Sequence, residues 1–468
     1  MIALWKYHKL PLLFFFISSI FYVSFAYDLV RSDTTKLLLL YVALFVFAFQ
    51  IIKKSGFNFS LLVIFSVAFR LLFLFATPNL SQDFYRFIWD GQMLLSGFNP
   101  YLTTPNFQME LGVITGFHNQ VELYNGMGSL SASHFTNYPP INQLCFLFAN
   151  LFPGKSILSS VIGLRLIIIA ADIGTLYFGK KLLERLKLPS TKIFWYILNP
   201  FIIIELTGNL HFEGVMIFFL VWSLYLLHVG KWKWAAIVLA CSISVKLIPL
   251  MLLPLFFNFF KLHKNEENAT SVLNLLKRLN LPKLITFYAI IGTTILLLFL
   301  PFFSMEFVDN YSKTVGLWFG NFEFNASIYY LIREIGFAIT GYNEIAIIGK
   351  ILPIISVLII LSFAFFKERN NLTRLITSML LVLTFYLFLS TTVHPWYIAT
   401  LVILSVFTNY KFPIVWSLVV VLSYLAYSNS TNSENLYIIG LEYGIVFSIF
   451  IWEVALKKRL LVSQQSIS

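Results

Sequence analysis

The sequence predicts an all-α, polytopic transmembrane protein with about 12–14 spans. Three observations predict this class. First, 59% of the 468 residues are hydrophobic and 12% are charged, whereas a soluble domain carries roughly 25% charged residues. Second, apolar segments close to the roughly 20 residues that cross a bilayer recur along the whole chain. Third, these segments lack the alternation of apolar and polar residues that strands of a membrane β-barrel show.

Helices are expected from these segments because backbone groups in lipid must form their hydrogen bonds within one segment. The predicted spans share an apolar composition and lie at residues 10–27, 35–52, 59–77, 156–179, 190–206, 211–229, 234–247, 249–260, 284–303, 345–366, 371–391, 396–410, 412–428 and 437–456. Residues 141–153 are too short to cross a bilayer, so we predict a partial or re-entrant helix there. Pro249 and Pro254 interrupt the apolar run 234–260, which predicts a hairpin of two short helices.

The basic residues predict the orientation in the membrane. With the spans above, every basic cluster falls on the side of the N-terminus, at residues 53–54, 180–187, 231–233, 261–283, 367–374, 411 and 457–459. The positive-inside rule makes this side cytoplasmic. Because topology signals explain the net charge of +12, no nucleic-acid partner is expected. We predict one transmembrane domain over residues 1–468, with a large extracytoplasmic loop at 78–140 and a polar tail at 461–468.

The segment Ser81–Tyr101 of this loop is the most informative part of the sequence. Ser81 is a typical helix N-cap, and Gly97 followed by Pro100 is a typical helix end. Helical spacing places the charged side chains on one face and apolar residues on another; the charged ones are Asp83, Arg86 and Asp90. We therefore predict an amphipathic helix at the membrane surface that presents two carboxylates and one guanidinium.

Three further polar motifs fall on the same predicted side of the membrane. They are Asn137–Pro140, Gly208–Glu213 and Val393–Tyr397. Acidic, basic, amide and aromatic side chains therefore converge on one face from distant parts of the chain, and a sugar-binding site uses these residue types. Lys246 lies near the same end of its span, where it either meets a lipid-linked phosphate or extends to the interface.

Other signals are weak or absent from the sequence. Arg165 and Asp172 face the same way on one predicted span, and the favoured interpretation is ion pairing inside the bundle. No His, Cys, Asp or Glu cluster has the spacing of a tight metal site, so no metal and no cofactor are expected. The sequence has no glycine-rich phosphate loop, which gives no support to a nucleotide substrate.

Several of these motifs resemble the GT-C class of membrane glycosyltransferases. The first pieces of the resemblance are Asp83–Gly91 (DFYRFIWDG), Gly97–Tyr101 (GFNPY) and Tyr138–Pro140 (YPP). The later pieces are Asn199-Pro200, Glu205, Gly208–Glu213, Lys246 with Pro249, and His394–Tyr397. The set is most similar to the polyprenyl-phosphate-mannose-dependent mannosyltransferases of bacteria. It covers the chain from about residue 80 to residue 400.

The resemblance implies a polyprenyl-phosphate sugar as donor, with mannose as the sugar, and a glycan or glycolipid hydroxyl as acceptor. It also implies inverting transfer on the extracytoplasmic side of a bacterial plasma (inner) membrane. An acidic residue of the first large loop would be the catalytic carboxylate, with Asp83 as first choice and Asp90 as second. The two acids lie seven residues apart and do not form an Asp-x-Asp pair, which leaves open both the choice between them and a role for a divalent metal.

The remaining candidate residues follow from the same chemistry. A departing lipid phosphate needs cationic donors, for which the candidates are Arg86, Lys246, His211 and His394. Substrate binding is assigned to polar and aromatic side chains of the matching motifs, namely Asn99, Tyr101, Tyr138, Glu205, Asn209, Glu213, Trp396 and Tyr397. The polyprenyl tail would lie in a groove between helices rich in Phe, Leu and Ile, and membrane lipid is a further expected partner.

Three other classes of protein compete with this interpretation. A transporter or flippase of a lipid-linked saccharide is also polytopic, but its site normally lies near the bilayer midplane between repeats. Here the polar motifs lie at one edge and no internal repeat is evident. A surface-glycan ligase or polymerase shares much of the chemistry with a larger donor. A non-catalytic scaffold leaves the converging polar residues unexplained.

Overall fold

A computed structural model describes residues 2–56, 58–112, 114, 116–257, 259–260, 280–320, 322–366, 371–429, 431 and 433–456. The fold is helical, and within these residues the β pairing is limited to one isolated bridge between Phe324 and Thr392. The predicted all-α class is therefore confirmed. The basic residues of segments 261–279, 367–370 and 457–459 and the predicted polar tail 461–468 lie outside the described residues.

The helices follow the predicted order along the chain. The main α-helices are α1 (Ile2–Tyr27), α2 (Thr34–Ser55), α3 (Phe59–Leu71), α4 (Asp83–Leu95), α5 (Pro105–Leu111), α6 (Gln120–Ala132), α7 (Pro140–Asn150), α8 (Ile157–Arg185), α11 (Glu213–His228), α12 (Trp232–Ile243), α14 (Leu281–Phe299), α15 (Met305–Gly320), α16 (Ile328–Thr340), α17 (Ile345–Phe366), α18 (Leu372–Leu389), α19 (Ile398–Val406), α20 (Phe412–Val419) and α21 (Leu436–Ile451). Shorter or irregular helices lie between them: η1 (Ser190–Ile193), α9 (Phe194–Ile197), α10 (Pro200–Ile202), η2 (Ile203–Gly208), η3 (Ile248–Phe256), η4 (Leu300–Phe302), η5 (Pro395–Tyr397), η6 (Val420–Ser428) and η7 (Trp452–Leu456).

Among the described residues, seven helices are long and apolar enough to cross a membrane, and a bent pair of helices makes an eighth candidate. Four shorter apolar helices account for further predicted segments: Phe59–Leu71, Trp232–Ile243, Pro395–Val406 and Phe412–Ser428. A multi-pass membrane protein is thus confirmed. Fewer helices reach full length than the predicted 12–14 spans, because prolines and broken turns shorten several apolar segments.

Both awkward segments of the sequence form short helices. Residues 140–150 form α7, which is too short to cross a bilayer and agrees with the predicted partial helix. The run 234–260 divides into α12 and the 3₁₀ helix η3, which agrees with the predicted pair of short helices. Pro249 lies in the first turn of η3, as a proline at a helix start does, whereas Pro254 lies inside η3.

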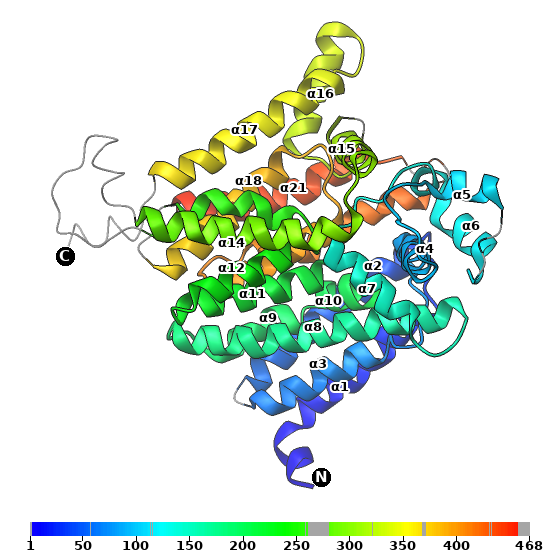
Figure 1. The fold of residues 1–468 in the computed structure, drawn as a ribbon. Helices are drawn as coiled ribbons and strands as arrows, with labels where there is room; N and C mark the ends of the chain where they lie inside the picture. Colours follow the sequence, from blue (N-terminus) through cyan, green and yellow to red (C-terminus); the bar gives the residue numbers. More distant parts are fainter. Residues whose placement is uncertain are drawn as a thin grey trace, which may run out of the picture.

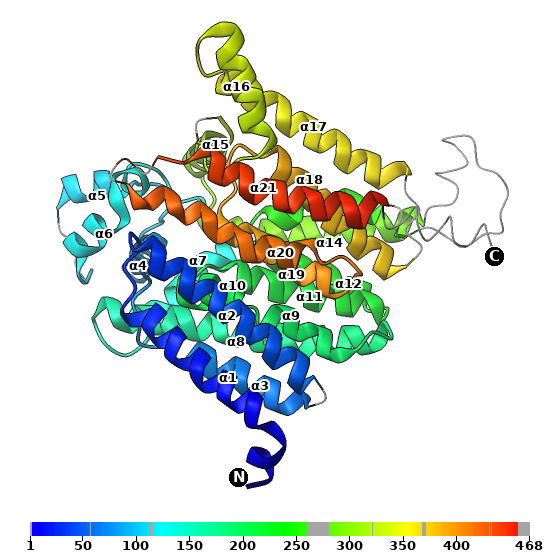
Figure 2. The ribbon, with the colours of Figure 1, turned by 180° about the vertical axis from the view of Figure 1, so that it is seen from behind.

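The long helices lie side by side in one bundle (Figures 1 and 2). Helices α1 to α3 form one flank, α8, α11 and α12 lie in the middle, and α17, α18 and α21 form the opposite flank. Helices α4, α5 and α6 gather at one end of the bundle in both views. Helix α16 projects beyond the bundle at the end of α17.

Buried charges inside the bundle pair with one another or with backbone carbonyls. Arg70 Nε lies 2.7 Å from Asp172 Oδ2, and both side chains are buried. Arg165 donates hydrogen bonds to the carbonyls of Thr207 and Gly208, at 2.9 and 3.0 Å. The predicted internal ion pairing is confirmed for Asp172, which pairs with Arg70, whereas Arg165 bonds to backbone carbonyls and forms no ion pair among the described residues. Because Arg165 satisfies carbonyls that a broken helix leaves free, it stabilises the break between η2 and α11.

Candidate active site

Helix α4 forms where the sequence predicted it, but its polar face is not on the molecular surface. The helix begins at Asp83 and ends at Leu95, and Gly97 follows with the positive φ of 79° that a helix stop favours. Arg86 and Asp90 are both buried, on a helix that packs against α6, α7 and α8. The prediction that Arg86 and Asp90 present their charges outward is therefore wrong, because these side chains neutralise one another inside the protein, whereas Asp83 on the same face is partly exposed.

Arg86 and Asp90 form a buried ion pair that holds the first large loop in place. Arg86 Nε donates to Asp90 Oδ1 at 2.8 Å, and its Nη1 donates to the carbonyls of Ser131 and His134 at 2.7 and 3.0 Å. Gln143 Nε2 donates to the other Asp90 oxygen at 3.0 Å. Both carboxylate oxygens of Asp90 are thus occupied, and Arg86 already has three protein acceptors. This geometry favours a structural role for the pair over a role in catalysis or phosphate binding.

Asp83 differs from Asp90 in having a free carboxylate. It is the first residue of α4, its side chain is partly exposed, and its backbone N–H donates to Ser81 Oγ at 3.3 Å. Within the described part of the chain, no hydrogen bond or ion pair engages its carboxylate oxygens. Burial raises the pKa of Asp83; Lys246 opposes this shift, Glu213 reinforces it and Arg31 opposes it. Asp83 is therefore a carboxylate of increased basicity without a protein partner.

Lys246 and Glu213 form an ion pair beside Asp83. Lys246 Nζ lies 2.5 Å from Glu213 Oε1, with 18% of the lysine side chain exposed and the glutamate side chain fully buried. Glu213 is the first residue of α11, where the helix dipole stabilises a carboxylate. Lys246 follows the end of α12. The pair brings together Lys246, which the sequence assigned to the donor phosphate, and Glu213, which it assigned to substrate binding. The second carboxylate oxygen of Glu213, Oε2, has no hydrogen-bond partner in the described structure.

The turn between η2 and α11 contributes three buried polar atoms without partners. The two helices meet at 115°, and Leu210 in the turn has φ of 64°. Asn209 Oδ1 accepts a hydrogen bond from the Leu80 N–H at 3.1 Å, which ties the turn to the segment that leads into α4. The unpartnered atoms are Asn209 Nδ2, His211 Nε2 and Glu213 Oε2. Buried polar atoms normally have partners, so these three atoms of the described structure make the turn a candidate binding site for a polar ligand.

Aromatic side chains from the C-terminal half form one wall of the site. The His211 ring stacks on Trp396 with a centroid distance of 3.7 Å, and Trp396 stacks on His394 at 4.6 Å. Tyr397 packs with its edge against His394 at 5.5 Å. Burial lowers the pKa of His394 to about 3, and the charges of Lys246 and Arg31 act in the same direction. His394 is therefore neutral and can offer a hydrogen bond but no positive charge.

Glu205 lies behind this wall. It belongs to η2, is buried, and accepts hydrogen bonds from the Tyr424 hydroxyl at 2.8 and 3.0 Å. Its Oε2 lies 3.7 Å from His211 Nε2. The structure thus joins Glu205 to the aromatic wall through His211.

Arg31 is a site residue that sequence reasoning missed. It lies between α1 and α2, and its guanidinium carbon lies 3.1 Å from the centroid of the Tyr427 ring. Its Nε atom is buried and has no hydrogen-bond partner. Its positive charge lowers the pKa of Asp83, although burial, Lys246 and Glu213 have larger effects. A signal was present in the sequence, because the positive-inside rule leaves arginine uncommon on the predicted outer side.

The other residues of the first loop mainly hold the loop together. Asn99 Oδ1 accepts the Tyr101 N–H at 3.1 Å, and Asn99 Nδ2 donates to the Phe302 carbonyl at 3.2 Å. The Tyr101 hydroxyl donates to the Tyr138 carbonyl at 2.6 Å. Of these residues, only Tyr138 is linked to the site, since its pKa is raised by burial and then by the negative charge of Asp83. Asn99 and Tyr101 are brought together with each other, and their polar atoms serve the loop.

A comparison with protein families identifies the family of the chain. The family model for the N-terminal domain of alpha-(1->6)-mannopyranosyltransferases matches residues 23–260, which is just over half of the chain. The matched region includes Arg31, Asp83, the turn at 208–213 and Lys246. A comparison with curated proteins finds no match. The chain therefore belongs to the family of alpha-(1->6)-mannopyranosyltransferases, and it is a membrane-embedded mannosyltransferase.

Proposed function

We propose that this enzyme transfers mannose from a polyprenyl-phosphate donor to a hydroxyl of a glycan or lipid-linked acceptor on the extracytoplasmic side of the membrane. The observation that carries the proposal is Asp83, whose carboxylate has no hydrogen-bond partner among the described residues and whose pKa, raised by burial, is lowered by the positive charges of Lys246 and Arg31. A glycosyl transfer from a phosphate needs this combination of a base for the acceptor and positive charge for the leaving group.

The reaction would proceed by one displacement. Asp83 accepts the proton of the acceptor hydroxyl as that oxygen bonds to the anomeric carbon of mannose. The bond from the anomeric carbon to the phosphate oxygen breaks, and polyprenyl phosphate leaves with the electron pair. Lys246 and Arg31 stabilise its negative charge, and charge-assisted hydrogen bonds are the strong ones for this purpose. The proposed phosphate-binding set thus contains Arg31 in place of Arg86, which serves Asp90 and two carbonyls.

The orphan polar atoms of the 208–213 turn would hold the sugar. Glu213 Oε2 accepts a hydrogen bond from a sugar hydroxyl, and Asn209 Nδ2 donates one. Trp396 is partly exposed and is held in place by stacking on His211 and His394, so its indole would contact the sugar ring. These polar atoms of the site would form hydrogen bonds only when the sugar hydroxyls are present, so sugar analogues that lack those hydroxyls would be rejected.

The stereochemistry follows from the displacement. A single displacement inverts the anomeric centre, so a product with the α linkage named for this family requires a donor in which mannose is β-linked to phosphate. We therefore propose a β-linked donor and an α-linked product for this chain.

The placement of the site supports an extracytoplasmic reaction. Helix α2 begins close to Arg31 and ends at the basic pair Lys53 and Lys54. Its 22 residues correspond to roughly 33 Å at 1.5 Å per residue, which is about one bilayer thickness. If Lys53 and Lys54 lie in the cytoplasm, as the positive-inside rule predicts, the site lies on the other side. Such a site has no access to cytoplasmic nucleotide sugars, which favours a lipid-linked donor and a bacterial plasma membrane as the location.

A transfer assay with purified protein tests the proposal. The protein is incubated with β-linked polyprenyl-phosphate mannose and a short α-mannoside acceptor, with the nucleotide sugar GDP-mannose as control donor. We expect released polyprenyl phosphate and an extended α-(1→6)-linked product from the lipid donor only. Transfer from GDP-mannose, or transbilayer movement of the donor without release of polyprenyl phosphate, would contradict the proposal.

A further inference from the structure

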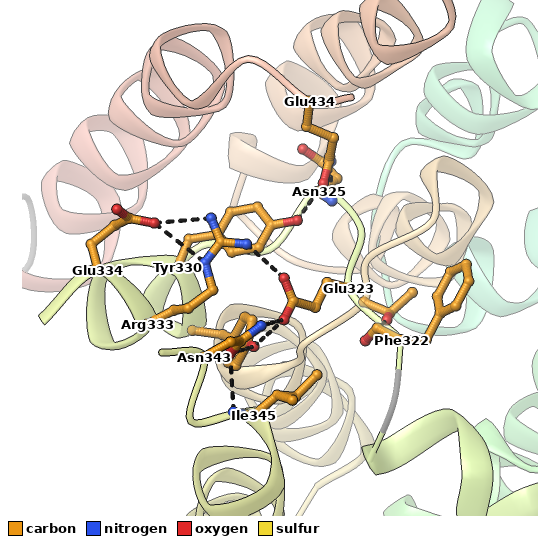
Figure 3. Close-up of polar contacts among 11 residues, drawn as sticks. Phe322, Glu323, Asn325, Tyr330, Arg333, Glu334, Asn343, Ile345 and Glu434 are labelled. Carbon is orange, nitrogen blue, oxygen red and sulfur yellow. Dashed lines mark hydrogen bonds and ion pairs between the residues drawn. The ribbon is translucent and has the colours of Figure 1, made fainter. Parts of the chain in front are cut away.

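A second polar network lies next to the site but does not belong to it. It joins three segments: residues 322–327, helix α16 with the following turn at Asn343, and the residues before α21 (Figure 3). The side chains of Glu323 and Arg333 point toward each other at its centre (Figure 3). None of these residues has a role in the chemistry described above.

Glu323 contacts three residues of this network. Its Oε2 lies 2.6 Å from Arg333 Nη1, and its Oε1 accepts hydrogen bonds from the Tyr329 hydroxyl at 2.5 Å and from Asn343 Nδ2 at 2.6 Å. The Glu323 and Arg333 side chains are 19% and 16% exposed. Because the pair is largely shielded from solvent, its attraction is screened less than that of a surface ion pair.

Glu434 supports the same segment from the other side. It accepts a hydrogen bond from the Asn325 backbone N–H at 2.7 Å and another from the Tyr330 hydroxyl. The segment 322–327 is therefore held at two points. The Glu323 carboxylate anchors residue 323 to Arg333, and the Glu434 carboxylate holds the backbone N–H of Asn325. The residue between these two fixed points is Phe324.

Phe324 connects the network to the active site. Its N–H donates to the Thr391 carbonyl at 3.1 Å, and its carbonyl accepts the Val393 N–H at 2.8 Å. Its ring lies 5.3 Å from the His394 ring and 6.1 Å from the Tyr427 ring. Tyr427 is the ring on which Arg31 rests. Phe324 therefore packs between His394 of the aromatic wall and Tyr427, the ring that contacts the proposed phosphate-binding residue Arg31.

We infer that Glu323 is a positioning residue: its ion pair with Arg333 holds Phe324 against His394 and Tyr427, and so sets the positions of His394 beside the sugar and of Arg31 at the donor phosphate. The inference rests on the proposed function, because it presumes that this wall receives the donor. A displacement of about 1 Å in such a support can cost about 100-fold in rate.

The first test compares two carboxylates that share the same arginine. Glu323→Gln keeps the shape of the side chain and removes its charge. Glu334→Gln removes the other carboxylate that pairs with Arg333, at 2.9 Å, but Glu334 is half exposed and belongs to α16. We expect kcat/KM to fall by about 10- to 100-fold in Glu323→Gln and to stay within about twofold of wild type in Glu334→Gln. Equal activity of the two variants, whether both high or both low, would overturn the inference.

The second test measures the position of the segment without using activity. Phe324 and Thr392 are bridge partners, and paired strands lie about 4.8 Å apart, within the range of Cα separations that a disulfide spans. Cys145 and Cys241 are the two native cysteines and are first replaced by alanine. The pair Phe324→Cys and Thr392→Cys should then cross-link readily under mild oxidation. Adding Glu323→Gln should slow this cross-link severalfold, and adding Glu334→Gln should not; unchanged cross-linking with Glu323→Gln would overturn the inference.

Two further variants separate this inference from the proposed function. If Glu323→Gln does not fold, Phe324→Leu removes the ring contacts and leaves the network intact, and kcat/KM should fall by about 10-fold or more; wild-type kcat/KM in Phe324→Leu would overturn the inference. Asp83→Asn is assayed in parallel. If Asp83→Asn is inactive while Glu323→Gln and Phe324→Leu are fully active, the positioning role fails and the proposed chemistry stands. If Asp83→Asn is active, the proposed function fails, and the cross-link alone decides whether Glu323 places the segment.

Discussion

Variants at Lys246 should separate its contribution to stability from its contribution to catalysis. Lys246→Met removes the counter-charge of Glu213, whose side chain is fully buried. Removing one partner of a buried ion pair costs about 3–5 kcal/mol. Because 18% of the lysine side chain is exposed, we expect the lower end of this range, about 3 kcal/mol of unfolding free energy. The unfolding temperature in detergent should therefore fall clearly.

The double variant Lys246→Met with Glu213→Gln should recover most of this stability, because it leaves no unpaired charge. It should not recover activity. A hydrogen bond to a charged group contributes about 1.5–3 kcal/mol, which predicts a loss of about 10- to 150-fold in kcat/KM for the donor. The matched control is Glu213→Gln alone, which carries the same change at residue 213 and keeps the lysine.

The assay is thermal unfolding together with donor-dependent transfer, measured for wild type, Glu213→Gln and the double variant. The reasoning predicts that the double variant is as stable as Glu213→Gln and much less active. If the two variants are equally active, Lys246 only neutralises Glu213 and does not bind the donor phosphate. If Lys246→Met is as stable as wild type, the ion pair does not contribute as described.

Three further predictions test other parts of the account. First, Asp83 must be ionised to act; burial raises its pKa above the ordinary 3.8, and the charge of Lys246 lowers it. Transfer should therefore decline as the pH falls through this pKa, and in Lys246→Met the acid limb of the kcat/KM profile should move to higher pH. An unmoved limb would show that another group titrates. Second, Arg31→Gln should reduce kcat/KM by about 10-fold or more. Lys36→Gln in the first turn of α2, where Lys36 pairs with Asp28, should have little effect; equal effects would remove Arg31 from the site. Third, a cysteine at exposed Glu122 in α6 should react with an impermeant reagent in intact cells and a cysteine at exposed Lys233 should not; the reverse pattern would invert the topology.

Local patterns in the sequence predicted the helices well. Ser81 and Gly97 gave the approximate ends of α4, and Pro249 and Pro254 correctly indicated two short helices in place of one span. These signals act through the backbone of neighbouring residues, so a sequence contains them in full. The predicted span 190–206 shows where local patterns fail: it is divided into several short helices, and its end is stabilised by Arg165 from α8, which is distant in sequence.

The sequence predicted which segments form the site, but not which of their side chains remain free for catalysis. Helical spacing shows that Arg86 and Asp90 share a face, but it does not show that Gln143 and two loop carbonyls cover that face. The pairing of Lys246 with Glu213 is likewise a tertiary contact between the ends of two helices. Arg31 was missed because its partner Tyr427 is almost 400 residues away in sequence. Motifs thus identify which segments carry the chemistry, and packing decides which of their side chains remain free for it.

The choice of Asp83 as catalytic base is the central claim, and Asp83→Asn tests it most directly. The substitution keeps the size of the side chain and removes its basicity, and because the carboxylate has no hydrogen-bond partner among the described residues, folding should be unaffected. General base catalysis contributes about 100- to 10,000-fold, so transfer from polyprenyl-phosphate mannose should fall by that factor while donor binding and the unfolding temperature stay near wild type. The exposed acid Glu122 in the same loop provides the control, Glu122→Gln, which should be fully active. Transfer at close to the wild-type rate by Asp83→Asn would contradict the account.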